Sequence, residues 1–241
     1  MDTRYILLWL EAPMQSWGAD SKFGRRDSLP FPTKSGVAGL LLCALGASGP
    51  QTELLEELAT LRQTVVSYAR QCKGKDSLLN KVDREPLLRD FHMVGSGYND
   101  DNPWESLLIP KTSEGKKAVG GGTKITYRYY LQDAKFAVVM EVPALRSDEF
   151  AEALQHPIYD LYLGRKNCVP TDFIFHGIFE TQEVALHNAE MLAHEKGLLI
   201  EDFRVVDGED ENGDSITLND IPVQFGEVKR YRDRRVTVIT K

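Results

Sequence analysis

The chain has 241 residues, of which 42% are hydrophobic and 27% charged, and its formal net charge is −7. That length can bury a substantial core, and the composition is ordinary for a soluble globular protein. No apolar run approaches the roughly 18 residues of a bilayer span, and no signal-peptide cleavage site follows the short apolar start. The three cysteines are widely separated, which argues against disulfides and zinc knuckles. These features predict a cytoplasmic protein that has no membrane contact, bound metal or cofactor.

The net acidity argues against a free-standing nucleic-acid binder, which usually carries an excess of Lys and Arg. The charge is unevenly spread, however. Residues 201–214 are strongly acidic, whereas 22–34, 111–128 and 229–241 are net basic. A phosphate backbone responds to charges within a Debye length of about 10 Å, so a local basic surface can bind it despite the overall charge.

The first half of the chain predicts alternating strands and helices. A near-continuous apolar run at 3–11 indicates a strand covered on both faces. Proline and glycine make 12–34 a loop, and Thr33 or Ser35 caps a helix that ends at Gly46. The other elements expected here are a helix at 52–62, strands at 64–72, 87–94, 123–131 and 135–142, and a long excursion at 95–122.

The second half repeats this mixed pattern. We expect a helix at 147–155, a loop at 157–172, a strand at 173–179, a helix at 181–195, a strand at 198–206, an acidic turn at 208–213 and a strand at 236–239. Two strand–helix–strand units with hairpins predict an α+β fold built on ferredoxin-like units. No linker is rich enough in Ser, Pro or Gly to separate two independent domains.

The first loop and the helix start after it are the most informative stretch. Backbone amides at a helix N-terminus favour an anion, so the position of Lys34 and Ser35 predicts a phosphate-binding site, or phosphate seat. Arg25 and Arg26 would add further contacts to the phosphate. Trp17 offers a flat ring on which a base could stack. Taken alone, these residues fit a solvated basic loop that caps a helix equally well. A nucleotide-hydrolase P-loop is excluded, because no GxxxxG spacing precedes the lysine.

Two further segments combine basic and aromatic residues. The strand at 123–130 alternates, so Lys124 and Arg128 share a face with Thr126 and Tyr130, and Ile125, Tyr127 and Tyr129 share the other. Such a strand suits RNA binding, although an ordinary half-buried strand is the commoner case. The turn at 159–168 places Gly164, which allows close backbone approach, before Arg165 and Lys166.

The sequence contains no convincing catalytic set. The histidines and cysteines show no HxxxH, HExxH or CxxC spacing, which argues against zinc chemistry. His92 is the best candidate for metal-free RNA cleavage, in which an imidazole acts as general base. A structural role is the commoner fate of a histidine placed on a strand.

Five segments occur in order along the chain: APMQSWG, FPTKSGVAGLL, RDFHMV, TYRYYLQDAKF and YLGRKNC. Together they resemble the CasD family of subunits from type I-E CRISPR Cascade complexes, which is part of the RAMP superfamily. The resemblance implies a ferredoxin-like (RRM-related) domain at 1–145, which includes a β-rich thumb extension at about 91–126. It also implies a small C-terminal α+β region at 146–241.

The resemblance further implies a non-catalytic subunit that binds the 5′ handle of CRISPR RNA and caps the backbone of the complex. Its partners would be the Cascade backbone subunit and the large subunit, with target DNA reached indirectly through the complex. The thumb would wedge between the RNA and the adjacent subunit and displace a base. The implied handle contacts, with Lys124 added from the strand pattern, are Gln15, Trp17, Arg25, Arg26, Lys34, Ser35, Lys124, Arg128, Gly164, Arg165 and Lys166.

Two alternatives remain open at this stage. A sister family on a similar fold is a metal-independent endoribonuclease that processes CRISPR RNA precursors, and such an activity would draw on Tyr98, Lys124 and His92. A purely architectural protein, whose basic loops meet acidic surfaces of partners, is the other.

Overall fold

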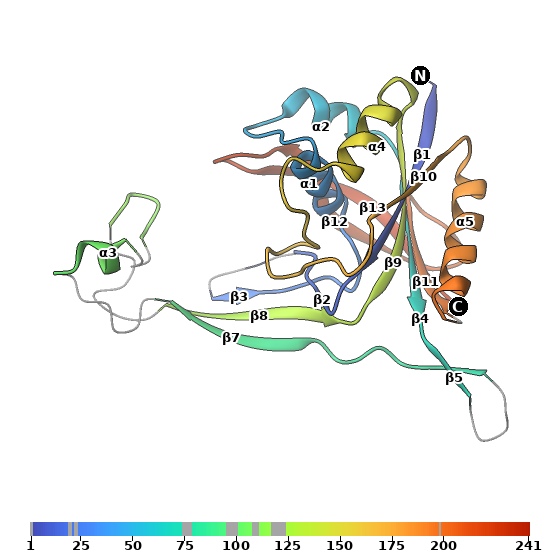
Figure 1. The fold of residues 1–241 in the computed structure, drawn as a ribbon, viewed down its shortest axis with the longest axis horizontal. Coiled ribbons are helices and arrows are strands. Elements are labelled where there is room, and N and C mark those ends of the chain that lie inside the picture. The colour runs from blue at the N-terminus through green and yellow to red at the C-terminus, as the bar shows by residue number, and fades with distance from the viewer. Residues whose placement is uncertain are drawn as a thin grey trace.

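The computed structural model describes residues 2–18, 21, 24–73, 79–94, 101–107, 111–116, 124–197 and 199–241. Its main body is a seven-stranded sheet in the order β10-β1-β9-β4-β11-β13-β12, with every neighbouring pair antiparallel (Figure 1). The strands are β1 Thr3–Glu11, β4 Gln63–Ala69, β9 Lys135–Pro143, β10 Phe175–Phe179, β11 Ile200–Asp207, β12 Asp214–Gln224 and β13 Arg230–Thr240. The mixed α+β class predicted from the sequence is confirmed.

Helices cover both faces of this sheet (Figure 1). Three of them, α1 Lys34–Ala44, α2 Thr52–Ala59 and α4 Ser147–Gln155, join the larger core. On the opposite face α5, Gln182–Glu195, packs through a row of alanines, whose small side chains let the helix lie close to the strands. Alternate residues of β1 enter the two cores, with Leu8 in one and Trp9 in the other, so the prediction of a strand covered on both faces is confirmed. A short 3-10 helix, η1 Ala144–Arg146, precedes α4.

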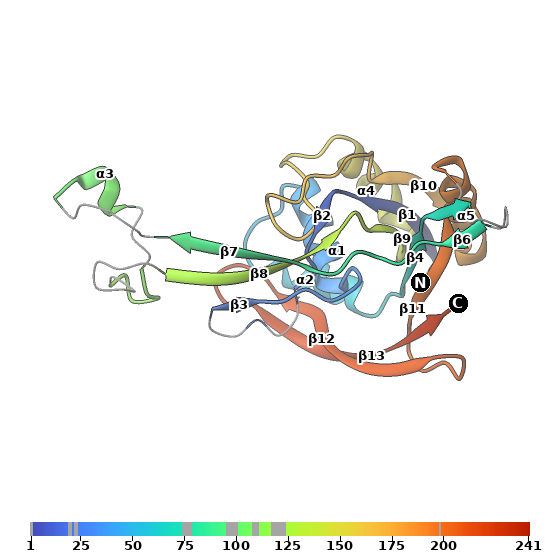
Figure 2. The same cartoon turned by 90° about the horizontal axis from the view of Figure 1, so that it is seen from below.

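A second, smaller sheet is built around β8 and carries the candidate site. Its long strands β7 and β8 form a ribbon that projects from the body, as Figures 1 and 2 show. The elements of this part are β2 Met14–Gln15, β3 Arg25–Arg26, β7 Leu88–Val94, α3 Pro103–Ser106 and β8 Lys124–Gln132, with a separate pair β5 Gln71–Lys73 and β6 Leu79–Lys81. Beyond the ribbon, the excursion expected at 95–122 lies mostly outside the described residues.

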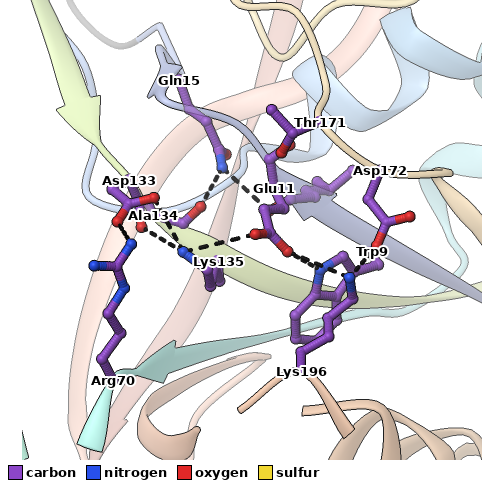
Figure 3. Close-up of polar contacts among 11 residues, drawn as sticks. Trp9, Glu11, Gln15, Arg70, Asp133, Ala134, Lys135, Thr171, Asp172 and Lys196 are labelled. Atoms are coloured by element: carbon purple, nitrogen blue, oxygen red, sulfur yellow. Dashed lines mark hydrogen bonds and ion pairs between the residues drawn. The ribbon is translucent and has the colours of Figure 1, made fainter. Parts of the chain in front are cut away.

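A chain of charged groups fixes the root of this ribbon to the main sheet (Figure 3). The turn between β8 and β9 contains Asp133, which has a positive φ of 48° and pairs with Arg70, the residue just after β4. The Lys135 ammonium lies 3.1 Å from the Asp133 carboxylate and 3.8 Å from Glu11. Glu11 in turn lies 3.5 Å from Lys196, just after α5. Because Lys135 is largely buried, desolvation lowers the pKa of its ammonium, and Glu11 compensates in part.

The C-terminal hairpin is the main departure from the predicted elements. The sequence predicted only a strand at 236–239, whereas β13 has 11 residues and pairs with the equally long β12. Five charged residues occupy the first half of β13, which hides the alternation typical of a strand. The first loop also contains two short strands, β2 and β3, because it lies along both sides of β8.

No helix in the part of the chain that the structure describes is long and apolar enough to cross a membrane.

Candidate nucleic-acid interface

Pairing in the small sheet brings charged residues of three strands into one row. Arg128 of β8 lies opposite Asp90 of β7 on one side and next to Arg26 of β3 on the other. Residues that are direct partners across two strands point to the same face. His92, two residues after Asp90, shares this face, as does Tyr130.

The loop at 157–172 closes over this row and is fastened by Arg165. Its guanidinium donates to the backbone carbonyls of Tyr129 (3.2 Å) and Arg26 (2.9 Å), and it lies 4.7 Å from the centre of the Tyr130 ring. Asn167 adds a hydrogen bond from its amide to the Tyr130 hydroxyl at 3.2 Å. Arg165 therefore holds β3, β8 and the loop in a fixed arrangement while its planar group remains half-buried at the site.

Gly164 allows the loop to lie directly against the first loop. Its φ is +95°, and a Cβ built there would overlap the carbonyl oxygen of Ser16. The Ser16 amide donates to the carbonyl of Leu163 at 3.1 Å, which holds the two backbones together. The position requires glycine for two reasons, the left-handed backbone and the absence of space.

These segments enclose a groove of about 660 Å³. It is lined by Arg26, Asp90, His92, Arg128, Tyr130, Tyr162, Gly164, Arg165, Lys166 and Asn167. Four cationic side chains face a single carboxylate there, and two tyrosine rings lie among them. A polyanion that carries planar rings is the ligand that such a lining complements. Arg26, Arg128, Gly164, Arg165 and Lys166 were predicted from three separate segments, and the structure brings them together.

Two residues predicted as contacts belong to the interior instead. Trp17 is 1% exposed and donates from its indole N–H to the Gln15 side-chain oxygen at 3.1 Å. Gln15 is 0% exposed, and its amide donates to the carbonyls of Leu10 and of Ala134, the second of which Figure 3 labels. The prediction that Trp17 presents an open ring to a base is therefore wrong, as is that of a Gln15 contact. These side chains fix the first loop from within.

The predicted phosphate seat at the start of α1 is also wrong. The Lys34 side chain turns inward and donates to the carbonyls of Ala59 (3.0 Å) and Leu61. Its backbone amide is bound by the carboxylate of Asp220 on β12 at 2.8 Å. Burial lowers the pKa of the Lys34 ammonium, with Asp207 and Asp220 acting in the opposite direction. The helix N-terminus therefore binds an anion, as the sequence argument required, but the anion comes from the chain itself.

The other three predicted contacts lie outside the groove. Arg25 points to the opposite face of the small sheet, where its guanidinium lies 5.0 Å from the Tyr129 ring centre. Lys124 is exposed at the outer end of β8, beyond the groove. Ser35 lines a neighbouring cleft.

That neighbouring cleft of about 1000 Å³ shares Tyr162 and Gly164 with the groove. Its walls are a face of α1 with small residues, including Gly36 and Gly39, and the β12–β13 hairpin. The sequence reading missed this cleft because it missed the hairpin. It also missed Asp90 and Asn167, although the alternation of 87–94 was a signal that Asp90 shares a face with His92.

The residues proposed for RNA cleavage do not assemble in the described structure. His92 lines the groove, and its Nδ1 is buried without a hydrogen-bond partner among the described residues. Lys124 is absent from the groove lining, and Tyr98 lies outside the described residues. Within the described ranges, His, Cys, Asp and Glu form no group that could hold a metal ion.

Comparisons with known proteins agree on one family. Residues 5–237 match the family described as "CRISPR-associated protein (Cas_Cas5)". The "CRISPR system Cascade subunit CasD" of Escherichia coli (strain K12) is 31% identical over 184 residues, which cover 74% of this chain and 73% of that protein. The resemblance to CasD predicted from the sequence is thus confirmed.

Two solved structures have the same fold. A chain of a "CRISPR RNA-guided surveillance complex" is 27% identical with a TM-score of 0.69, over 98% of this chain and 90% of that one. A second, "Crystal structure of Cas protein", is 26% identical with a TM-score of 0.59, over 98% and 94% of the two chains. In fold and in sequence, over nearly its whole length, the chain belongs to the Cas5 family of CRISPR-associated proteins.

Proposed function

We propose that this protein is a non-catalytic subunit of a type I-E Cascade complex and that it binds the 5′ handle of CRISPR RNA in the groove. The observation that carries the proposal is the convergence of Arg26, Arg128 and Lys166, from three separate segments, on one tyrosine-lined groove. The similarity to CasD supports the complex in which this would occur. Capping of the backbone, and contact with the backbone and large subunits, belong to the same proposal.

Each part of the groove has a distinct role in this mechanism. The cationic side chains bind phosphates and so fix the register of the RNA strand. These phosphate contacts carry no sequence information by themselves. Tyr162 offers a ring surface to a base that has left the stack, whereas Tyr130 is 2% exposed and supports Arg165 from below. Asn167 and His92 offer polar groups to base edges. The groove thus suits a single-stranded segment held in a fixed conformation.

The strand order supports the ferredoxin-like part of the fold prediction. Four strands of the main sheet stand in the order β10-β1-β9-β4, and α1 and α4 form the two crossovers. We infer a ferredoxin-like unit of six elements, into which the projecting ribbon is inserted between β4 and β9. The division of the chain at residue 145 stays a prediction.

Removing charge from the groove is expected to weaken RNA binding in a salt-dependent way. For Arg128→Ala/Lys166→Ala, two lost phosphate contacts should reduce the slope of log affinity against log salt by about 1.4, since each contact on a single strand contributes about 0.7. Fluorescence anisotropy with a labelled CRISPR repeat RNA measures both affinity and slope. Lys241→Ala removes a positively charged side chain that lies outside the groove, and it serves as the control. An unchanged slope for the double variant would contradict the proposed groove.

The position of His92 in the groove keeps metal-independent cleavage as the rival function. We expect repeat RNA incubated with the full chain in EDTA to stay intact, because Lys124, the lysine predicted to act with His92, does not line the groove. Denaturing gel electrophoresis of the RNA checks this. If the RNA is cleaved at a specific site and His92→Ala abolishes that cleavage, the protein is an endoribonuclease and not a non-catalytic subunit.

A further inference from the structure

The small sheet has a second exposed face, opposite the groove. Side chains alternate across a strand, so the residues between the groove residues point to this reverse face. Three strands contribute to it, and we call their seven residues the platform: Arg25, Arg89, Phe91, Met93, Ile125, Tyr127 and Tyr129.

Rings and guanidinium groups already contact one another on the platform, with the planes of Phe91 and Tyr127 tilted by 59°. The Phe91 and Tyr127 rings lie opposite one another on β7 and β8, with centroids 5.5 Å apart. Arg89 lies 5.6 Å from the Tyr127 ring centre. Arg25 lies over Tyr129 in the same way. The arrangement is a row of planar groups whose order is fixed by strand pairing.

The apolar side chains of the platform are open to solvent. Phe91 is 51% exposed, Met93 52%, Ile125 44% and Tyr127 41%. An exposed apolar group of this kind, on strands that project from the body, marks a binding surface rather than a core.

The charges on this face select the type of ligand. The strand residues of the platform include two arginines and no acid, and the carboxylate of Asp27 lies 2.7 Å from Arg25 at its edge. Arginine and tyrosine planes stack on nucleobases, whose π-faces are common to all sequences. A single-stranded nucleic acid supplies both the rings and the negative charge that this surface complements.

The platform and the groove are connected at one edge. Arg25 and Arg26 are consecutive residues of β3, which is the edge strand beside β8 at this point. Arg26 lines the groove, whereas Arg25 lies on the platform. An RNA strand bound by Arg26 therefore needs to cross only the protein backbone of β3 to reach the opposite face of the small sheet.

We propose that the platform stacks unpaired bases of the RNA whose phosphates lie in the groove, so that the strand passes over the β3 edge and contacts both faces of the small sheet. This inference rests on the proposed function, since it extends the same RNA to a second surface.

The test uses the full chain and short single-stranded RNAs of mixed sequence that carry 2-aminopurine at successive positions. Stacking on an aromatic ring quenches the fluorescence of this base. Phe91→Leu/Tyr127→Leu removes both rings but keeps an apolar cross-strand pair, so the ribbon retains its pairing. We expect its RNA affinity to fall about ten-fold or more, with the quenching lost at one or more positions. The control Phe173→Leu removes an aromatic ring that is 85% exposed outside the platform and the groove, and it should leave affinity and quenching unchanged.

The outcomes separate the inference from the proposed function. If the leucine pair binds RNA with wild-type affinity and quenching while Arg128→Ala/Lys166→Ala is weakened, the groove stands and the platform proposal fails. If the wild-type chain binds no RNA, the proposed function itself fails. Loss of assembly with partner subunits by the leucine pair, at unchanged RNA affinity, would make the platform a protein-docking surface and overturn the inference.

Discussion

Replacing Gly164 by alanine is expected to destabilise the protein by about 2–6 kcal/mol and to weaken RNA binding at least ten-fold. The left-handed backbone at φ +95° costs about 1–3 kcal/mol for a residue with a Cβ. Overlap with the Ser16 carbonyl adds an overpacking cost of about 1–3 kcal/mol. Relief of that overlap requires the loop to move away, which displaces Arg165 and Lys166 from the groove.

A second glycine separates the two causes. Gly49 also has a positive φ, +81°, but a Cβ there meets no atom within 4 Å. Gly49→Ala should therefore show the backbone cost alone, about 1–2 kcal/mol, with RNA affinity unchanged. Urea denaturation and RNA titration of both variants measure the difference. Equal losses of stability would mean that the close approach of the two loops contributes nothing.

The second large effect is expected at Arg234, which lies in a buried charge network beneath the C-terminal hairpin. Its guanidinium donates to both carboxylate oxygens of Asp220, at 2.7 and 2.9 Å, and pairs with Asp207. The Arg234 and Asp220 side chains are only 8% and 6% exposed. Arg234→Met leaves two carboxylates without their main partner, and breaking such a buried pair costs about 3–5 kcal/mol.

The adjacent residue is a matched control for this substitution. Arg235 pairs with Glu209 at 3.0 Å, but both side chains are more than half exposed, at 54% and 69%. Solvent screens such a pair, so Arg235→Met should cost at most about 1 kcal/mol. The free energies of unfolding in urea distinguish the two. If the free energy of unfolding falls by the same small amount in both variants, the buried charge network of Arg234 does not stabilise the fold as described.

Most of the regular elements could be predicted from the sequence because their periodicity is clear. The strand at 3–11 coincides with β1, and the hairpin at 123–142 is β8 and β9 with Asp133 in the turn. The C-terminal hairpin was missed because Arg234 is a buried arginine. Its burial depends on two acids from other strands, and no local pattern reports that pairing.

The candidate site could be predicted in part, for a similar reason. Residue type identified the basic segments, but it could not tell which lysine points outward. Lys34 and Lys166 both stand in short basic stretches, yet Lys34 is 8% exposed and satisfied by backbone carbonyls. Residue type likewise predicted that Trp17 is a stacking ring, whereas in the structure its indole N–H donates to Gln15, which is buried beside it. Which segments meet at the groove depends on the fastening by Arg165, which is a tertiary contact.

The two-residue strand β3 places a strict limit on the length of the first loop. Its pairing sets Arg25 beside Tyr127 and Arg26 beside Arg128, one for each face of the small sheet. A shift of one residue reverses every side chain on a strand. A shift in one direction would set Asp27 beside Arg128 and direct a carboxylate toward the groove. The number of residues between the buried Trp17 and Arg25 thus determines the sign of the charge that the groove receives.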